Sequence, residues 1–440
     1  MAIKDAFLEQ DKFKDDVRKK GEEFLKYIDK HGEKAIVLAG RPYHLDKEVN
    51  HGIDNSLGLA VLTEDLSKLE SNLRVVNQWT YHYRVYHAAD VVSRYNNLEL
   101  VNLNSFGCGL DAIVTDQAEE ILRRNNKLYT TIKIDEINNL GAAKIRIRSL
   151  IASMNKRVSD NSYVPYTYTK NYFKESDRRY TLLFPDMSEF HMPLFEALLQ
   201  SEGYNVVYLR DSDVESVNTG LRYVNNDAYY PAIIVIGQLI SALKSGKYDL
   251  ENTSVIITQT GGECRATNYI GLIRKVLVDA GFSNVSILSF NFSGLEKQQA
   301  FHINLSMAKK ALEAVVYGDL LMKLLLATRP YEVKKGRSME VYEKWNNKCC
   351  ESVKNGRFSE FKDNIKNIVS DFKKIRTKKD EKPKVGIVGE ILINYHTFGN
   401  DNLVLKLENE YAEVFAPELM GFVKYCCINA ISKSDLLKTL

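Results

Sequence analysis

The sequence has few cysteines and no long apolar run. Four of its six cysteines form two adjacent pairs, which is not the framework of a disulfide-rich secreted domain. No stretch of about 18 apolar residues occurs, and the first segment, MAIKDAFLEQDKFKDDVRKK, has the charges of an amphipathic helix and lacks the apolar stretch of a secretory signal. We therefore expect a cytoplasmic protein without a membrane partner, in which any special cysteine is a reactive thiol or a metal ligand.

The chain also lacks an excess of charge of one sign. Its 60 basic and 57 acidic side chains leave a net charge of +3, so no global field favours non-specific binding to nucleic acid or anionic lipid. With 45% hydrophobic residues and only 8 prolines in 440 positions, the chain has enough apolar material for two or three ordinary domains.

Short β-branched runs alternate with longer segments of helical period along the chain. This alternation predicts an α/β protein with two doubly wound (Rossmann/flavodoxin-like) units and a partial third α/β segment. The predicted strands are Ala35–Ala39, Ala60–Thr63, Glu99–Asn102, Tyr129–Ile134, Tyr180–Phe184, Asn205–Leu209, Ser254–Thr258, Val285–Phe290 and Val385–Val388. The predicted helices between them include Asp111–Arg123, Ala142–Met154, Met192–Ser201, Pro231–Leu243 and Lys297–Leu326.

Composition also suggests where the domains divide. The stretch 155–179 is polar, rich in tyrosine and without periodicity, so it is the expected linker between a first α/β unit, 1–154, and a second, 180–328. The remainder, 329–440, begins with a segment dense in lysine, aspartate and asparagine and is expected to hold helices and the partial third unit.

Two cysteines follow predicted strands in the same way. Cys108 and Cys264 each come after a strand and a Ser/Thr and Gly turn, directly before a helix, where an open α/β sheet has its ligand crevice. The positive helix end favours a thiolate there, and two such thiolates could hold an iron–sulfur cluster, zinc or copper(I). The glycines around them would let the backbone approach the ligand. These glycines are Gly107, Gly109, Gly261 and Gly262.

Other interpretations of the two cysteines stay open at this stage. Each could be a small buried hydrophobe, or its turn could be a cradle for a small anion in which the thiol matters little. Neither site has CxxC spacing, and a phosphatase-type loop is excluded because Val114 and Ile270 stand where it would need an arginine. The pairs Cys349–Cys350 and Cys426–Cys427 are interpreted as ordinary core or surface residues.

Three further polar segments have simple structural interpretations. In Gly40–Gly52 a crevice loop whose Arg41 contacts an anionic ligand is favoured over a mononuclear metal site. Gln78–Arg84 is expected to form a buried polar and aromatic layer. Tyr223–Asp227 is expected to cap the helix opened by Pro231.

Taken together, six motifs resemble a known family in order and spacing. They are GRPYH…NHGI, SFGCGLDA, KIDEINNLGAAKIRIRSL, GLRYVNNDAYYPA, QTGGECRATNYIGLIRK and VGIVGEIL. Over nearly the whole chain they resemble the C-terminal region of the large proteins related to the activases of 2-hydroxyacyl-CoA dehydratases, a region similar to dehydratase subunits and double-cubane cluster proteins. The resemblance implies that Cys108 and Cys264 are ligands of a [4Fe–4S] cluster. It also implies that an ATP-dependent activase reduces this cluster by one electron, and that the reduced cluster supports radical dehydration or reduction of an acyl-CoA or another small molecule in anaerobic metabolism.

The sequence departs from that family at identifiable places. Tyr229 stands where the family motif would carry a third cysteine, and the activase domains are missing, so the activase would be another polypeptide. The family would also continue beyond Leu440. These departures favour an alternative, a cluster-free scaffold or binding subunit, or a truncated copy, that assembles with other family domains.

Overall fold

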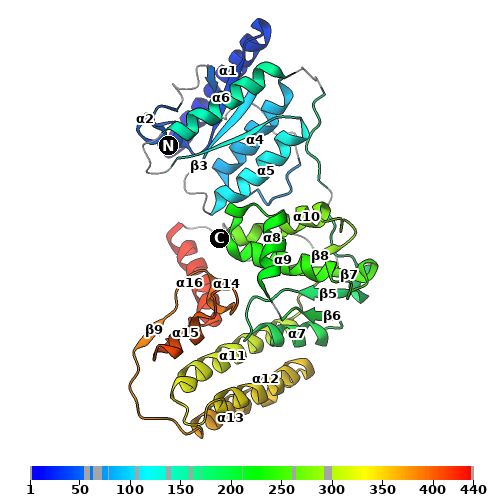
Figure 1. Cartoon of the computed structure of the whole chain (residues 1–440), viewed down its shortest axis with the longest axis vertical. Coiled ribbons are helices and arrows are strands. Elements are labelled where there is room, and N and C mark those ends of the chain that lie inside the picture. The colour runs from blue at the N-terminus through cyan, green and yellow to red at the C-terminus, as the bar shows by residue number, and fades with distance from the viewer. Residues whose placement is uncertain are drawn as a thin grey trace. The chain divides into compact units, whose positions relative to one another are not determined.

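The computed structural model of the chain describes residues 2–53, 60–62, 72–77, 79–104, 109–134, 140–157, 162–168, 170–210, 212–259, 264–291 and 300–437 (Figure 1). The chain forms two compact units. Unit 1 comprises Met1–Lys170, Asn225–Tyr229 and Gln259–Lys275, and unit 2 comprises Asn171–Val224, Tyr230–Thr258 and Val276–Leu440. The four-part division drawn from composition stays a prediction.

Unit 1 is built on a four-stranded parallel sheet with the strand order β2-β1-β3-β4. Its strands are β1 (Ala35–Ala39), β2 (Ala60–Leu62), β3 (Leu98–Asn104) and β4 (Tyr129–Lys133). Every residue of β1 and β3 is buried, as expected for central strands of a parallel sheet with helices on both faces.

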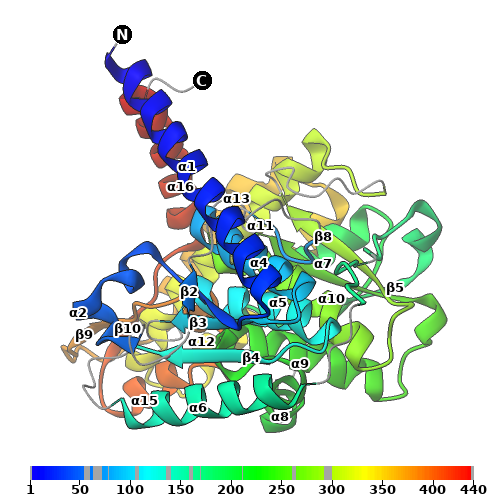
Figure 2. The same ribbon diagram turned by 90° about the horizontal axis from the view of Figure 1, so that it is seen from above.

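Helices cover both faces of this sheet. They are α1 (Ala2–His31), α4 (Thr80–Arg94), α5 (Leu110–Arg124) and α6 (Gly141–Lys156), and the short η1 (Pro42–Leu45) and α2 (Lys47–Asn50) lie in the segment after β1. Because successive strand residues point to opposite faces, Val37 and Leu100 pack with α4 and α5, whereas Ile36 and Val101 pack with α6. Figure 2 shows α6 and α4 on opposite sides of β4.

Unit 2 repeats this topology with the strand order β6-β5-β7-β8. Its strands are β5 (Thr181–Phe184), β6 (Asn205–Tyr208), β7 (Thr253–Gln259) and β8 (Ser286–Asn291), and β5 pairs in parallel with both β6 and β7. Its helices include α7 (Met192–Ser201), α8 (Val214–Tyr223) and α9 (Tyr230–Lys244), whereas α10 (Tyr269–Asp279) begins in unit 1 and ends in unit 2.

The C-terminal part of the chain extends unit 2. Helices α11 (Leu305–Thr328), α12 (Arg337–Asn355) and α13 (Phe361–Lys373) share one apolar core with β5, β6 and α7. A small parallel sheet of β9 (Lys384–Gly386) and β10 (Glu413–Phe415) follows, with α14 (Ile391–Tyr395) and α15 (Leu403–Asn409) between its strands. Helix α16 (Leu419–Leu437) comes last. The remaining 3₁₀ turns are η2 (Glu175–Arg179), η3 (Asn226–Ala228), η4 (Leu250–Asn252), η5 (Arg265–Asn268), η6 (Arg329–Tyr331) and η7 (Phe358–Glu360).

These elements confirm the predicted α/β fold class. Some details of the prediction are wrong. The helix expected over Lys297–Leu326 starts later, at Leu305, because the side chain of Asn304 accepts a hydrogen bond from the Met307 amide and caps it there. Asn225 caps η3 and not the helix that contains Pro231. Among the described helices, none combines the length and the apolar character that crossing a bilayer requires.

Candidate functional site

The candidate site in unit 1 lies where the strand order of its sheet reverses. From β1 the chain first adds β2 on one side and then β3 on the other, so the segments that follow β1 and β3 diverge from one point. In doubly wound sheets such a switch point opens a crevice at the carboxyl ends of the strands. Arg41 follows β1 at this point, and α5 follows β3.

Asp111, in the first turn of α5, joins the polar groups at this switch point. Arg41 donates from Nη2 to Asp111 Oδ1 over 3.1 Å, and His82 Nε2 lies 3.1 Å from the same oxygen. Burial alone would raise the pKa of Asp111, but the contacts with His82 and Arg41 lower it below its usual value. Arg41 thus pairs with a carboxylate of the protein, where an anionic ligand was expected.

The space beside this cluster is small. His82 Nδ1 and Asp111 Oδ2 are buried and have no hydrogen-bond partner among the described residues. The adjoining cavity has a volume of about 10 Å³, which is room for one water molecule. The cluster can therefore fix the start of α5, but it cannot take a ligand of several atoms. Within Gln78–Arg84, Gln78 lies outside the described residues, and the expected buried layer is only partly right, because Trp79 and His82 are buried while Tyr81 is half exposed.

Of the six residues predicted to hold a cluster, the structure describes two. Gly109 is the N-cap of α5 with φ of +69°, a conformation that favours glycine. Cys264 is exposed, occupies the N-cap position of η5 and follows β7. The other four lie outside the described residues: Gly107, Cys108, Gly261 and Gly262.

The segment that carries Cys264 belongs to unit 1, like α5. Residues 259–275 form part of unit 1, and within it η5, which begins one residue after Cys264, contacts α5. Helix α5 itself begins two residues after Cys108. In this division of the chain, the segment that carries Cys264 and helix α5 belong to the same unit.

Tyr229, at the position where the family motif would have a cysteine, also belongs to unit 1. The guanidinium carbon of Arg265 lies 3.3 Å from the centre of the Tyr229 ring, a cation–π contact next to Cys264. The backbone of Tyr229 has φ of +99°, which is strained for a residue with a bulky side chain, and η3, just before it, contacts α5. Two separate segments, η3 and η5, therefore contact α5.

The described residues around α5 and η5 offer few side chains that could ligate a metal. Within the described parts of the chain, no group of three or more His, Cys, Asp or Glu side chains is arranged to hold a metal ion. Cys349 and Cys350 lie in α12 of unit 2, where burial raises the pKa of Cys350 to about 12 and that of Cys349 even higher. Cys426 and Cys427 are exposed on α16.

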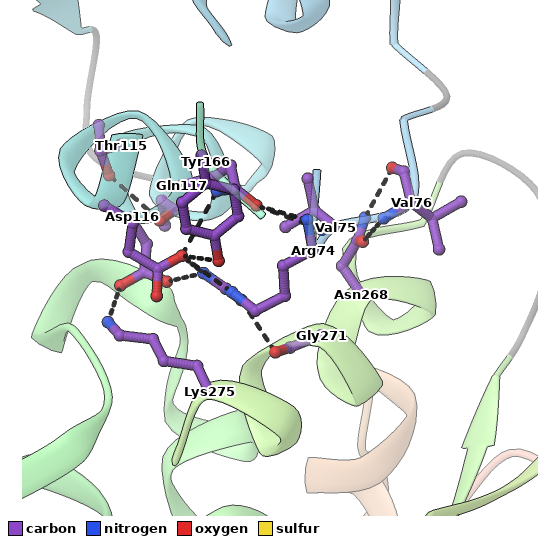
Figure 3. A network of polar contacts seen from close by, with 12 residues as sticks. Arg74, Val75, Val76, Thr115, Asp116, Gln117, Tyr166, Asn268, Gly271 and Lys275 are labelled. Carbon is purple, nitrogen blue, oxygen red and sulfur yellow. Dashed lines mark hydrogen bonds and ion pairs between the residues drawn. The ribbon is translucent and has the colours of Figure 1, made fainter. Parts of the chain in front are cut away.

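A buried ion network, which sequence patterns did not predict, holds this region together (Figure 3). Arg74 is almost completely buried, and it donates to Asp116 over 2.6 Å, to Glu120 over 2.9 Å and to the carbonyl of Gly271 over 2.9 Å. Lys275 reaches the second oxygen of Asp116 at 2.6 Å. The network ties α5 to the start of α10, and so fixes the segment that carries Cys264. Asp116 and Glu120 lie four positions apart and therefore on the same face of α5, but this spacing does not indicate which distant residues they contact.

A hydrogen-bonded Ser188, His191 and Asp319 in unit 2 superficially resemble a hydrolase triad. Ser188 Oγ lies 2.8 Å from His191 Nδ1, and His191 Nε2 lies 3.0 Å from Asp319 Oδ1. Both oxygens of Asp319 also accept amide hydrogen bonds at the start of α16, and all three side chains are buried. These three hydrogen-bonded residues therefore hold the start of α16 in place, and Ser188 is not accessible as a nucleophile.

Comparison with family models gives a match in the first part of the chain. Residues 1–66, which include α1 and β1, match the family model described as "CoA enzyme activase uncharacterised domain". No curated protein and no solved structure matches the chain. The first 66 residues thus relate this chain to proteins of the CoA enzyme activase type.

Proposed function

We propose that the chain is an iron–sulfur-dependent component that receives one electron from a separate ATP-dependent activase in the cytoplasm. The electron would serve dehydratase-like or reductive chemistry on an acyl-CoA or another small molecule. One observation carries the proposal: exposed Cys264 precedes a turn that contacts α5, the helix that starts just after Cys108. The match of residues 1–66 to a CoA enzyme activase domain supports it independently.

The residues present fit such a cluster only in part. Thiolates are the ligands that iron–sulfur clusters take, and an exposed cysteine at the start of a turn is open to one. A cubane usually takes about four protein ligands, and Cys108 and Cys264 supply two. The proposal therefore requires ligands from a partner chain or a second copy. When bound, the cluster would store and deliver single electrons, and the role of this chain would be to hold it between α5 and η5.

A second candidate is a cluster-free scaffold or binding subunit that assembles with an activase or other family domains. The contact between Tyr229 and Arg265 favours it, because a phenol replaces the third thiol and its ring face is taken by a cation. A phenol oxygen is a harder ligand than a thiolate and suits this kind of cluster poorly.

Iron and acid-labile sulfide in the anaerobically purified full chain distinguish the two candidates. If a cluster is held, both elements exceed trace levels, fall in Cys108→Ala and Cys264→Ala, and persist in Cys426→Ala, which removes an exposed thiol from α16. Tyr229→Cys adds a thiol beside Arg265 and should raise the iron content. Trace iron in both the natural chain and Tyr229→Cys would leave the cluster-free subunit as the function.

A further inference from the structure

Unit 2 contains a cavity lined by α11, α12, the segment after β5 and the segment that joins β9 to β10. Its volume is about 140 Å³, enough for a molecule about the size of benzene. The residues that line it belong to two continuous described segments, 170–210 and 300–437. Unit 2 contains neither α5 nor the segment that carries Cys264, so the argument does not depend on the proposed cluster.

The inner wall of the cavity is apolar. Phe190, Met322 and Leu326 line it, and all three are buried in the hydrophobic core of unit 2. Tyr395, which is also buried, adds a second aromatic ring, and its hydroxyl already donates to the carbonyl oxygen of Pro417 over 2.7 Å. A wall of this kind takes up the hydrocarbon part of a ligand, because apolar surface leaves water there.

The positive charge at the cavity is already paired. Arg329 lines the cavity and donates to both carboxylate oxygens of Glu408, from Nε over 2.8 Å and from Nη2 over 3.0 Å. In a bidentate pair the carboxylate takes up much of the charge and two of the donors of the guanidinium. Arg329 therefore does not make the cavity a site for anions.

Glu189 supplies a negative charge that no such pair cancels. It lines the cavity and is exposed, and within the described residues its carboxyl forms no ion pair. The side chain of Thr397 donates a hydrogen bond to it, and Asp186 and Arg329 act on it electrostatically with opposite sign. Because a carboxylate can accept about four hydrogen bonds, the bond from Thr397 leaves room for an ammonium group.

A buried amide adds a second acceptor. Asn394 in α14 is 8% exposed and lines the cavity. Its Nδ2 donates weakly to the carbonyl oxygen of Gly389 over 3.4 Å, whereas its Oδ1 accepts no hydrogen bond from the described part of the chain. A donor on a bound molecule would satisfy this oxygen, and an ammonium group has several donors to offer.

We propose that this cavity binds a small organic monocation, with its ammonium group on Glu189 and Asn394 and its hydrocarbon part against Phe190, Met322 and Leu326. An anion would meet the carboxylate of Glu189 and find Arg329 already paired. The volume of the cavity limits the ligand to about the size of benzene.

The test uses isoamylammonium, which has as many non-hydrogen atoms as benzene and a branched apolar tail, as the probe for the full chain. Ligand-observed NMR titration should show saturable binding of this cation. Isoamyl alcohol, which has the same shape and a hydroxyl donor but no charge, should bind at least about tenfold more weakly. Glu189→Gln should weaken binding of the cation by a similar factor, because it removes the charge and keeps the size of the side chain. Asn394→Ala should weaken it by a smaller factor.

Glu351→Gln provides the matched control, because Glu351 is an exposed acid on α12 and is not among the described residues that line the cavity. It should leave the affinity unchanged, and both glutamate variants should keep the circular dichroism spectrum of the natural chain. The proposal fails if isoamylammonium does not bind saturably, if isoamyl alcohol binds equally well, or if both glutamate variants lose the same affinity. Tighter binding of isovalerate than of isoamylammonium would overturn the assignment to cations.

Discussion

Among single residues, Glu313 on α11 carries the clearest pH signature. Its side chain is buried, its Oε2 has no hydrogen-bond partner in the described part of the chain, and burial raises its pKa from 4.5 to about 7. The folded state thus holds a proton that the unfolded chain releases, so Glu313 reduces stability as the pH rises from 4.5 to about 7. We expect Glu313→Gln to match the natural chain below pH 4.5 and to be more stable above pH 7, by about 1–3 kcal/mol.

Urea unfolding at both ends of that pH range measures this difference. Glu351→Gln, an exposed change on α12, should stay within about 0.5 kcal/mol of the natural chain at either pH. Equal stabilisation by the two variants would mean that the buried carboxyl of Glu313 is not the cause.

Sequence patterns predicted site residues only where a strand, a turn and a helix follow one another along the chain. Gly109 was identifiable because strand, turn and helix succeed one another along the chain, and the same order places Cys264 at the N-cap of η5. The pairing of Asp111 with His82 and Arg41 was missed, because it joins side chains from three separate segments. Local periodicity does not encode such partners.

At the scale of elements, two glycines set the crossing of α8 and α9. A Cβ atom on Gly237 would overlap the carbonyl oxygen of Ser216, and one on Gly220 would overlap that of Ile233. Because the obstacles are backbone atoms, side chains cannot move aside. We expect Gly237→Ala to lower the free energy of unfolding by about 3 kcal/mol, measured by urea denaturation. Gly421→Ala, in α16 with open space around it, should be neutral or stabilising by up to about 1 kcal/mol. Equal effects of the two changes would contradict close packing of α8 on α9.

Element positions followed from the sequence where one signal dominated. The strand Ala35–Ala39 and the helix Met192–Ser201 were predicted with the bounds that the structure has. The α11 helix was predicted too early, because the hydrophobic pattern continues upstream while the capping side chain of Asn304 decides the start. Strand β10 was missed, since Glu413–Phe415 contains only one β-branched residue and no run that marks a strand.

For the whole molecule, the alternation of strands and helices was enough to predict the α/β class, the two parallel sheets and the partial third segment. Alternation does not say which distant segments share a core. Residues 225–229 and 259–275 belong to unit 1 although unit 2 surrounds them in sequence. Contacts such as that of Arg74 with Gly271, 197 positions apart, produce this interleaving.

A mutation that destabilises one unit should therefore leave the stability of the other unit unchanged. Arg74→Met removes one partner of a buried network and leaves Asp116 and Glu120 close together, so we expect unit 1 to lose about 3–5 kcal/mol. Hydrogen exchange followed by mass spectrometry should then accelerate in α4 and α5 and stay unchanged in α11 and α12 of unit 2. Arg123→Met, which breaks only the exposed pair with Glu119 on the same helix, should change neither. Faster exchange throughout both units in Arg74→Met would show that the chain opens as one cooperative body, because a network confined to unit 1 can destabilise unit 2 only if the two unfold together.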